Sequence, residues 1–244
     1  MKTPVFCTAG DSTALRHGKN QLLQWGYSVT STPTPQTTHL LLPVPSMEKP
    51  GVIKGNIPLE DLLGTLPEHI TILGGNLPVL GRKYVDLLKD EYYLTENATI
   101  TAHCTMEILA QNHHRPIHSE EILIIGWGRI GKQLSSLLKA QGANVTVAVR
   151  KDTDLQALQQ LGFNAVKTDH WDPKKYQIII NTAPALVLNE EETSSNALLI
   201  DLASIKGIAG DRVIWAKGLP NLYAPDLSGI LIAKTALRYA LGKE

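Results

Sequence analysis

The sequence predicts an α/β protein of two Rossmann-like lobes with parallel sheets, with a dinucleotide-binding domain as the C-terminal lobe and a cleft between the lobes. Three observations predict this fold. Short apolar runs of strand length alternate with amphipathic helical patterns along the chain. One run, Ile122 to Ile125, turns through three glycines into a helical pattern, as a dinucleotide-binding fingerprint requires. The 244 residues can also form two modest domains that each bury a core.

The N-terminal part predicts the elements of the first lobe. The run from Val5 to Ala9 predicts a strand, and Asp11 or Ser12 is placed to cap a helix that begins near Thr13 and ends at Gly26. The other elements expected in this lobe are strands at 27–30, 39–42 and 70–73, a turn at 47–51, a surface hairpin at 52–56 and a helix at 57–63.

A mostly helical connector at 97–111 is expected to cross between the lobes. The elements expected after the strand at 122–125 are strands at 144–149, 165–166, 177–180 and 198–200, a helix at 154–161, a short element at 212–215 and a final apolar helix at 228–241. We therefore expect an N-terminal substrate or partner lobe at 1–96, which the helix at 228–241 joins, and an NADP-binding Rossmann domain at 97–225.

The glycine turn is the strongest functional signal in the sequence. Its first glycine permits the tight turn, the second lets a pyrophosphate approach the backbone, and the third lets the helix pack on the strand. The N–H groups at the start of the helix then face the phosphates. A chance glycine loop is the alternative, but the strand and helix fall where the motif needs them. The expected cofactor-binding residues here are Gly126, Trp127, Gly128, Arg129, Ile130 and Gly131.

The end of the second strand of this domain favours NADP over NAD. An NAD site usually has an acidic residue there, about 20 residues beyond the glycines, which binds the ribose 2′-hydroxyl. This strand instead ends in Val149 followed by Arg150 and Lys151, two cations that would neutralise a 2′-phosphate. The alternative is that both are ordinary solvated charges and that Asp152 is a late acidic residue for NAD.

Polar residues follow the next two strands, and loops after parallel strands line the ligand site of such sheets. Each of these residues could instead cap a helix or make a turn hydrogen bond. The candidate catalytic residues are Asn181, Asp201, Ser204 and Lys206, with Lys54 as a further candidate cation for an anionic substrate. The candidate cofactor contacts on these loops are Thr182, Ala183 and Pro184.

Composition excludes several classes of partner. Lys and Arg balance Asp and Glu, so nothing indicates nucleic acid or an anionic membrane surface, and no segment is long and apolar enough to predict a membrane span. Two distant cysteines and the lack of a signal-type apolar core indicate a soluble cytoplasmic protein, and we expect a homo-oligomer. His113, His114 and His118 lack a carboxylate or cysteine at ligand spacing, so no metal site is predicted.

Several motifs, in order, resemble the A-type subunit of dipicolinate synthase. The resemblance covers nearly the whole chain, and its later motifs are the more specific in combination. They are Ala9-Gly10-Asp11, Leu42-Pro43-Val44-Pro45, Asn97-Ala98 with Thr101-Ala102, the glycine turn 126–131, the run 142–147, Asn181-Thr182-Ala183-Pro184-Ala185, Asp201-Leu202-Ala203-Ser204, and Gly218-Leu219-Pro220 followed by Ala224-Pro225.

The resemblance implies an NADP-dependent oxidoreductase that oxidises a dihydrodipicolinate-type intermediate of the lysine pathway to dipicolinate, the calcium-chelating acid of bacterial spores. It implies a small dicarboxylate substrate and a flavoprotein-like partner, the B-type subunit of the same synthase. Two positions depart from the family pattern. His103-Cys104 stands where the family usually has Glu-Gly, and Asp226-Leu227 where it usually has Lys-Thr.

Two other functions stay open on the sequence. One is a divergent enzyme related to 2-hydroxyacid dehydrogenases, which generally use a histidine late in the nucleotide domain; this chain has no histidine after His170. The other is a non-catalytic nucleotide-binding subunit that regulates a partner, for which the two departures are the sequence hint.

Overall fold

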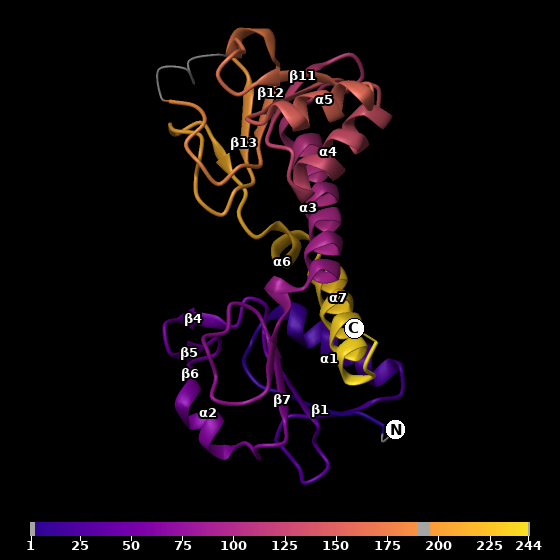
Figure 1. Cartoon of the computed structure of the whole chain (residues 1–244), viewed down its shortest axis with the longest axis vertical. Coiled ribbons are helices and arrows are strands. Elements are labelled where there is room, and N and C mark those ends of the chain that lie inside the picture. Colours follow the sequence, from indigo (N-terminus) through magenta and orange to yellow (C-terminus); the bar gives the residue numbers. More distant parts are fainter. Residues whose placement is uncertain (1–2, 190–195, 244) are drawn as a thin grey trace. The chain divides into compact units, whose positions relative to one another are not determined.

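The computed structural model describes residues 3–189 and 196–243, and the chain divides into two compact units (Figure 1). The first lobe comprises residues 1–97 and 220–244, and the second lobe comprises residues 98–219. Each lobe contains a parallel sheet, and the first lobe also contains a small antiparallel sheet. The predicted α/β fold with two lobes built on parallel sheets is confirmed.

The parallel sheet of the first lobe has the strand order β2-β1-β3-β7-β8, which is the order of flavodoxin-like sheets. The small sheet has the order β4-β5-β6. The elements of this lobe are β1 (Val5–Thr8), α1 (Thr13–Gln24), β2 (Ser28–Thr30), β3 (His39–Leu41), β4 (Met47–Lys49), β5 (Val52–Ile53), β6 (Ile57–Pro58), α2 (Leu59–Thr65), β7 (Thr71–Gly74), β8 (Tyr84–Asp86), a 3-10 turn (Leu87–Lys89), the start of α3 (Glu91–Asn112) and α7 (Pro225–Ala240).

Helices from the N-terminal and C-terminal parts of the chain pack together in the first lobe, where α1 lies against α7 (Figure 1). Glycines let the two helices touch: a Cβ on Gly229 would lie 2.5 Å from the carbonyl oxygen of Ala14, and a Cβ on Gly18 would lie 2.9 Å from the carbonyl oxygen of Gly229. Close contact of two backbones requires residues without side chains. The C-terminal helix is therefore an integral part of the first lobe.

Several element limits in the first lobe differ from the sequence prediction. The expected turn at 47–51 contains strand β4, and the expected surface hairpin contains Ile53, which is fully buried. The helix expected at 57–63 begins at Leu59, because Ile57 and Pro58 pair with β5 instead. Strands of two or three residues carry too short a pattern to be recognised, since pairing rather than sequence stabilises them.

The helix expected from residue 97 begins six residues earlier, at Glu91 of α3. The carboxylate of Asp90 accepts a hydrogen bond from the Tyr93 N–H at 2.7 Å, which caps this earlier start. Asp90 also accepts a hydrogen bond from the Tyr239 hydroxyl of α7 at 2.8 Å.

No helix within residues 3–189 and 196–243, α3 included, is long and apolar enough to cross a membrane.

The sheet of the second lobe has the strand order β11-β10-β9-β12-β13-β14, entirely parallel, which is the order of dinucleotide-binding sheets. The order reverses between β9 and β12, so the carboxyl ends of these two strands flank the expected ligand crevice. The elements are β9 (Glu121–Ile125), α4 (Arg129–Ala140), β10 (Asn144–Val149), α5 (Asp152–Gln160), β11 (Asn164–Lys167), a 3-10 turn (Pro173–Lys175), β12 (Ile178–Asn181), β13 (Leu198–Asp201) and β14 (Ile214–Trp215), with α6 (Leu219–Tyr223) following.

Two extended segments, around Leu188 and Ile208, pack into the hydrophobic core of this sheet. Leu188 and Ile208 form an isolated parallel bridge and are buried against Leu123, Ile179 and Leu199. The N–H of Val187 donates to the Gly207 carbonyl at 2.7 Å, and that of Ala209 to the Leu188 carbonyl at 3.0 Å. The loops after β12 and β13 are thus bound to each other.

Gly229→Ala tests the contact between α1 and α7. Alanine favours a helix over glycine by about 1 kcal/mol, but forcing its methyl group into the Ala14 backbone should cost more, and we expect a net loss of about 2 kcal/mol of stability. Thermal unfolding measures this loss. Gly64→Ala in α2 is the matched control, because a Cβ there meets nothing within 4 Å, and it should leave stability unchanged or slightly raised. Equal effects at the two glycines would contradict the packing described.

Candidate functional site

The glycine turn after β9 is built by close backbone contacts at the point where strand order reverses. Gly126 has φ +107°, which favours glycine, and a Cβ there would lie 2.6 Å from the Thr182 hydroxyl oxygen. A Cβ on Gly131 would overlap the carbonyl oxygen of Gly126. These contacts bring the first turn of α4 against the end of β9, as the third fingerprint glycine is expected to do.

Gly128 differs from the other two glycines because its missing side chain faces open space. A Cβ there would meet no atom within 4 Å, and its φ of −78° is available to any residue. Gly128 is also the N-cap of α4, and its lack of a side chain leaves the helix start without a side-chain cap. An anion such as a pyrophosphate could therefore approach the backbone and the helix N-terminus here.

The other residues of the turn surround this opening. Arg129 is exposed at the first position of α4, and Ile130 is half-buried beside it. Trp127 is half-buried, and its ring lies edge-on to Phe163 at a centroid distance of 5.7 Å. The Lys132 ammonium lies 5.8 Å from the centroid of the Trp127 ring. The indole thus packs on the connection between α5 and β11.

Strands β10 and β11 end in a group of cations. Arg150 and Lys151 are exposed directly after β10, as the sequence predicts. Lys167, the last residue of β11, pairs in register with Val149 and donates from its ammonium to the Arg150 carbonyl at 2.6 Å. The same ammonium lies 2.9 Å from the carboxylate of Asp152, the acidic residue considered as an alternative for NAD. Lys167 therefore lies beside the two predicted cations, a position that the sequence analysis did not identify.

Asn181 and Asp201, two of the candidate catalytic residues, are fully buried and hydrogen-bonded to each other at 3.0 Å. The Asn181 side-chain Oδ1 accepts from the Ala183 N–H at 2.9 Å, and its Nδ2 donates to the Ala183 carbonyl at 2.9 Å. The Asp201 carboxylate accepts from the N–H groups of Ala203, Gly207 and Ile208 at 3.0, 2.6 and 2.8 Å. Both side chains are thus bound to the loops that leave β12 and β13.

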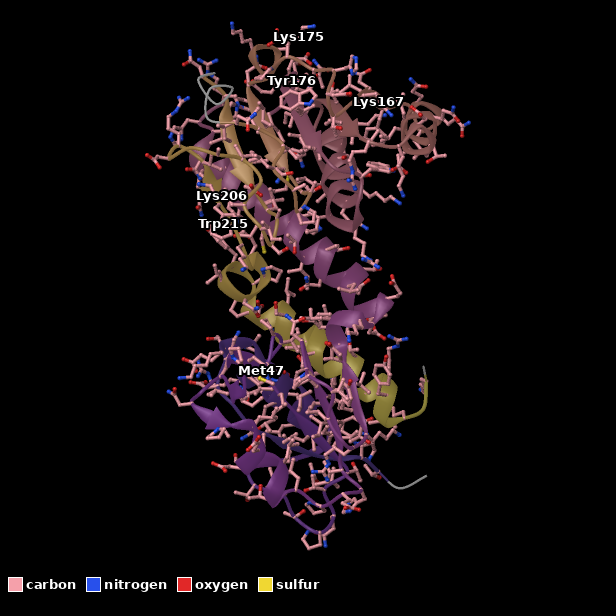
Figure 2. The ribbon with its side chains drawn as sticks, turned by 60° about the vertical axis from the view of Figure 1, so that its left-hand side comes forward. Met47, Lys167, Lys175, Tyr176, Lys206 and Trp215 are labelled. Carbon is pink, nitrogen blue, oxygen red and sulfur yellow. The ribbon has the colours of Figure 1, made fainter. Side chains whose placement is uncertain are left out.

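The same loops carry the candidates that are accessible. Thr182 is half-buried, and its hydroxyl donates to the Ile125 carbonyl at 3.0 Å, so it ties the end of β12 to β9. Ala183 is half-buried and Pro184 exposed. Ser204 and Lys206, the latter labelled in Figure 2, are exposed after β13. The Lys206 ammonium donates to the Gly210 carbonyl at 3.0 Å.

The corresponding strand ends of the first lobe are covered by the chain itself. Gly10, after β1, has φ +90°, and a Cβ there would lie 2.8 Å from Pro43 and 2.9 Å from Ile53. The Asp11 N–H donates to the Lys54 carbonyl at 2.9 Å. Burial lowers the pKa of the Lys54 ammonium, an effect that the nearby Glu48 partly opposes. Pro43, Ile53 and the Lys54 backbone therefore fill the space beside the turn that follows β1.

The histidine-rich segment 113–118 lies away from the glycine turn, before β9 begins. His113 and Glu120 face each other, with Nε2 to Oε1 at 3.3 Å. They help to line a cavity of about 840 Å3 beside Tyr176 and Leu198, at the amino ends of β12 and β13. The glycine turn is at the carboxyl ends of the strands, so this cavity is a separate feature. In the part of the chain that the structure describes, no three His, Cys, Asp or Glu side chains are grouped to hold a metal ion.

The two departures from the family pattern fall on helices. His103 is exposed on α3, while Cys104 is buried. A buried side chain therefore stands at position 104, where the family usually has glycine. Asp226 lies in the first turn of α7, where a negative charge favours the helix N-terminus. Leu227 is 47% exposed.

Comparisons with known proteins agree with this architecture. A family model described as the TrkA-N domain matches residues 122–219. The A-type subunit of dipicolinate synthase from Bacillus subtilis (strain 168) is 28% identical over 228 residues, covering 86% of this chain and 77% of the relative. The resemblance to this dipicolinate synthase family that the motifs predict is confirmed.

Two solved structures extend the similarity to the whole fold. The structure of the A-type dipicolinate synthase subunit from Bacillus halodurans has a TM-score of 0.82 at 19% identity, covering 98% of each chain. The corresponding structure from Bacillus subtilis has a TM-score of 0.82 at 23% identity, covering 100% of this chain and 99% of the other. Both structures share the fold of this chain over nearly its whole length, so the similarity includes both lobes.

Asp201→Asn tests the buried hydrogen-bond network. An amide can accept at only one of its two ends, so N–H donors now bonded to the carboxylate would lose their acceptor, and we expect a loss of about 3 kcal/mol of stability. Thermal unfolding checks this, and the exposed Asp211→Asn in the same lobe is the control. An unchanged unfolding midpoint for Asp201→Asn would show that the carboxylate does not hold the loops.

Proposed function

We propose that this chain is an NADP-dependent oxidoreductase that oxidises a dihydrodipicolinate-type intermediate of the lysine pathway to dipicolinate. The observation that carries this proposal is the glycine turn of the second lobe, open at Gly128 and closed at Gly126 and Gly131, in a chain similar to the A-type subunit of dipicolinate synthase. The turn supports dinucleotide binding, and the similarity supports the choice of reaction.

The residues of the turn fit a dinucleotide. The open position at Gly128, the α4 N-terminus without a side-chain cap and the parallel strand order are the features that a pyrophosphate site needs. The six turn residues, with Thr182, Ala183 and Pro184 from the β12 exit, are our proposed cofactor contacts. For the 2′-phosphate of NADP we propose Arg150 and Lys151, whose exposed side chains lie at the end of β10.

The proposed reaction removes a hydride and a proton from the dihydropyridine ring, and the bound nicotinamide supplies the hydride acceptor. Aromatisation of the ring favours the product, so the chain needs no strong base. Ser204 and Lys206, exposed on the β13 exit loop, are our candidates for contact with the substrate, where the Lys206 ammonium could pair with a carboxylate. Asn181 and Asp201 become positioning residues, since both side chains are buried and bound to the exit loops.

Further proposals follow from the similarity rather than from the site. We propose that the two compact units are the predicted domains, a substrate or partner lobe and a nucleotide-binding domain. We also propose a flavoprotein of the B type as partner, a role in sporulation, a homo-oligomeric state and a cytoplasmic location.

A non-catalytic regulatory subunit is the second candidate function, because only two of the four candidate catalytic side chains are exposed. Substrate oxidation by the purified chain, by itself and with the flavoprotein partner, separates these two functions.

Gly128→Ala tests the pyrophosphate site without disturbing the fold. The added methyl group meets no protein atom but projects into the space that the pyrophosphate would use, so NADPH should bind at least tenfold more weakly, a loss of about 1.4 kcal/mol. Fluorescence titration measures binding, and thermal unfolding of the free protein should show little change. Unaltered NADPH affinity would contradict the assignment of this turn.

Titration with NADPH and NADH, with and without dipicolinate, tests the cofactor and the ligand class together. We expect wild-type protein to prefer NADPH, dipicolinate to strengthen that binding, and Arg150→Ala with Lys151→Ala to remove the preference. Losing two charge-assisted contacts should cost about 2 to 4 kcal/mol of NADPH binding and leave NADH binding little changed. Lys174→Ala with Lys175→Ala, in the 3-10 turn before β12, is the matched control. A wild-type protein indifferent to the phosphate and to dipicolinate would refute the proposed function.

A further inference from the structure

The strand beside β10 contributes a cation to the proposed 2′-phosphate site. Lys167, labelled in Figure 2, is the last residue of β11 and lies opposite Val149 of β10. Its ammonium is held at two points, 2.6 Å from the Arg150 carbonyl and 2.9 Å from the Asp152 carboxylate. An ammonium group has three N–H donors, so one remains beyond these two contacts.

The same contact changes what Asp152 can do. A carboxylate near the end of this strand is what NAD requires, because it accepts hydrogen bonds from the ribose hydroxyls. Here the carboxylate of Asp152 is paired with the Lys167 ammonium, which offsets its charge and occupies one of its oxygens. An incoming 2′-phosphate would meet Arg150, Lys151 and the ion pair of Lys167 with Asp152, a group whose summed charge stays positive and whose carboxylate is already engaged.

Other acidic groups near Lys167 do not reverse this balance. The Asp169 carboxylate accepts a hydrogen bond from His170 at 2.7 Å, and this bond, more than the field of Lys167, holds the pKa of Asp169 below its usual value. Asp169 follows β11 and is engaged by its own neighbour. The ion pair between Lys167 and Asp152 is the contact that lies at the end of β10.

We propose that Lys167 contributes to the preference for NADP over NAD together with Arg150 and Lys151, as a third cation of the 2′-phosphate site and as the group that occupies the Asp152 carboxylate, which could otherwise serve as the ribose acceptor. This inference rests on the proposed function, since it concerns the same nucleotide site. It differs from the sequence prediction because this residue lies on β11, beyond the segment in which such fingerprints are read.

Lys167→Gln and Asp152→Asn, each titrated with NADPH and NADH, test the inference. We expect Lys167→Gln to weaken NADPH binding roughly tenfold, as one charge-assisted contact is lost, and to leave NADH binding equal or tighter because Asp152 is released. Asp152→Asn should leave NADPH binding unchanged or tighter. Lys167→Arg, which keeps the charge, should retain most of the preference.

Lys175→Gln is the matched control, because Lys175 is an exposed lysine elsewhere on the second lobe (Figure 2). Thermal unfolding of each variant separates a local effect from loss of structure. An unchanged ratio of the two affinities in Lys167→Gln, or selective loss of NADH binding in Asp152→Asn, would overturn the inference. The Arg150→Ala with Lys151→Ala variant distinguishes failure of this inference from failure of the proposed function. If it loses the preference for NADPH while Lys167→Gln keeps it, only the inference about Lys167 is wrong. A wild-type protein without any preference would overturn both.

Discussion

Close backbone contact at the glycine turn is the constraint on which the second lobe depends. Gly131 lies against the Gly126 carbonyl, and Thr182 fills the space beside Gly126 while its hydroxyl binds the Ile125 carbonyl. Together these contacts fix the start of α4, the end of β9 and the end of β12. Gly128 stays open in the middle of this rigid frame, which makes the helix N-terminus accessible without any rearrangement of the chain.

A buried carboxylate provides the second fixed point. Asp201 binds three backbone N–H groups of its own exit loop and the Asn181 amide of the neighbouring strand, so the loops after β12 and β13 are held as one unit. The Leu188 and Ile208 bridge adds an apolar contact between the same loops. Side chains that could meet a ligand are therefore the exposed ones that this frame presents, Ser204 and Lys206, and not the two that form it.

The sequence predicted the parts of this structure that depend on local patterns. The glycine spacing and the apolar run at 122–125 predicted β9, its turn and α4, because the backbone contacts there require glycine. Lys167 could not be found in this way, since its role depends on pairing between β10 and β11, which sequence distance does not reveal. Burial separated Asn181 and Asp201 from Ser204 and Lys206, although all four follow strands in the same manner. The short strands β4 and β6 were missed because pairing alone stabilises them.

The most direct measurement is a crystal structure of the protein with NADPH. We expect the pyrophosphate on the backbone at Gly128 and the N-terminus of α4, and the 2′-phosphate within hydrogen-bonding distance of Arg150, Lys151 and the Lys167 ammonium. A nucleotide bound elsewhere would contradict the assignment of the glycine turn. A ribose hydroxyl bonded to Asp152, with the phosphate directed away from the three cations, would contradict the specificity that we assign to this strand edge.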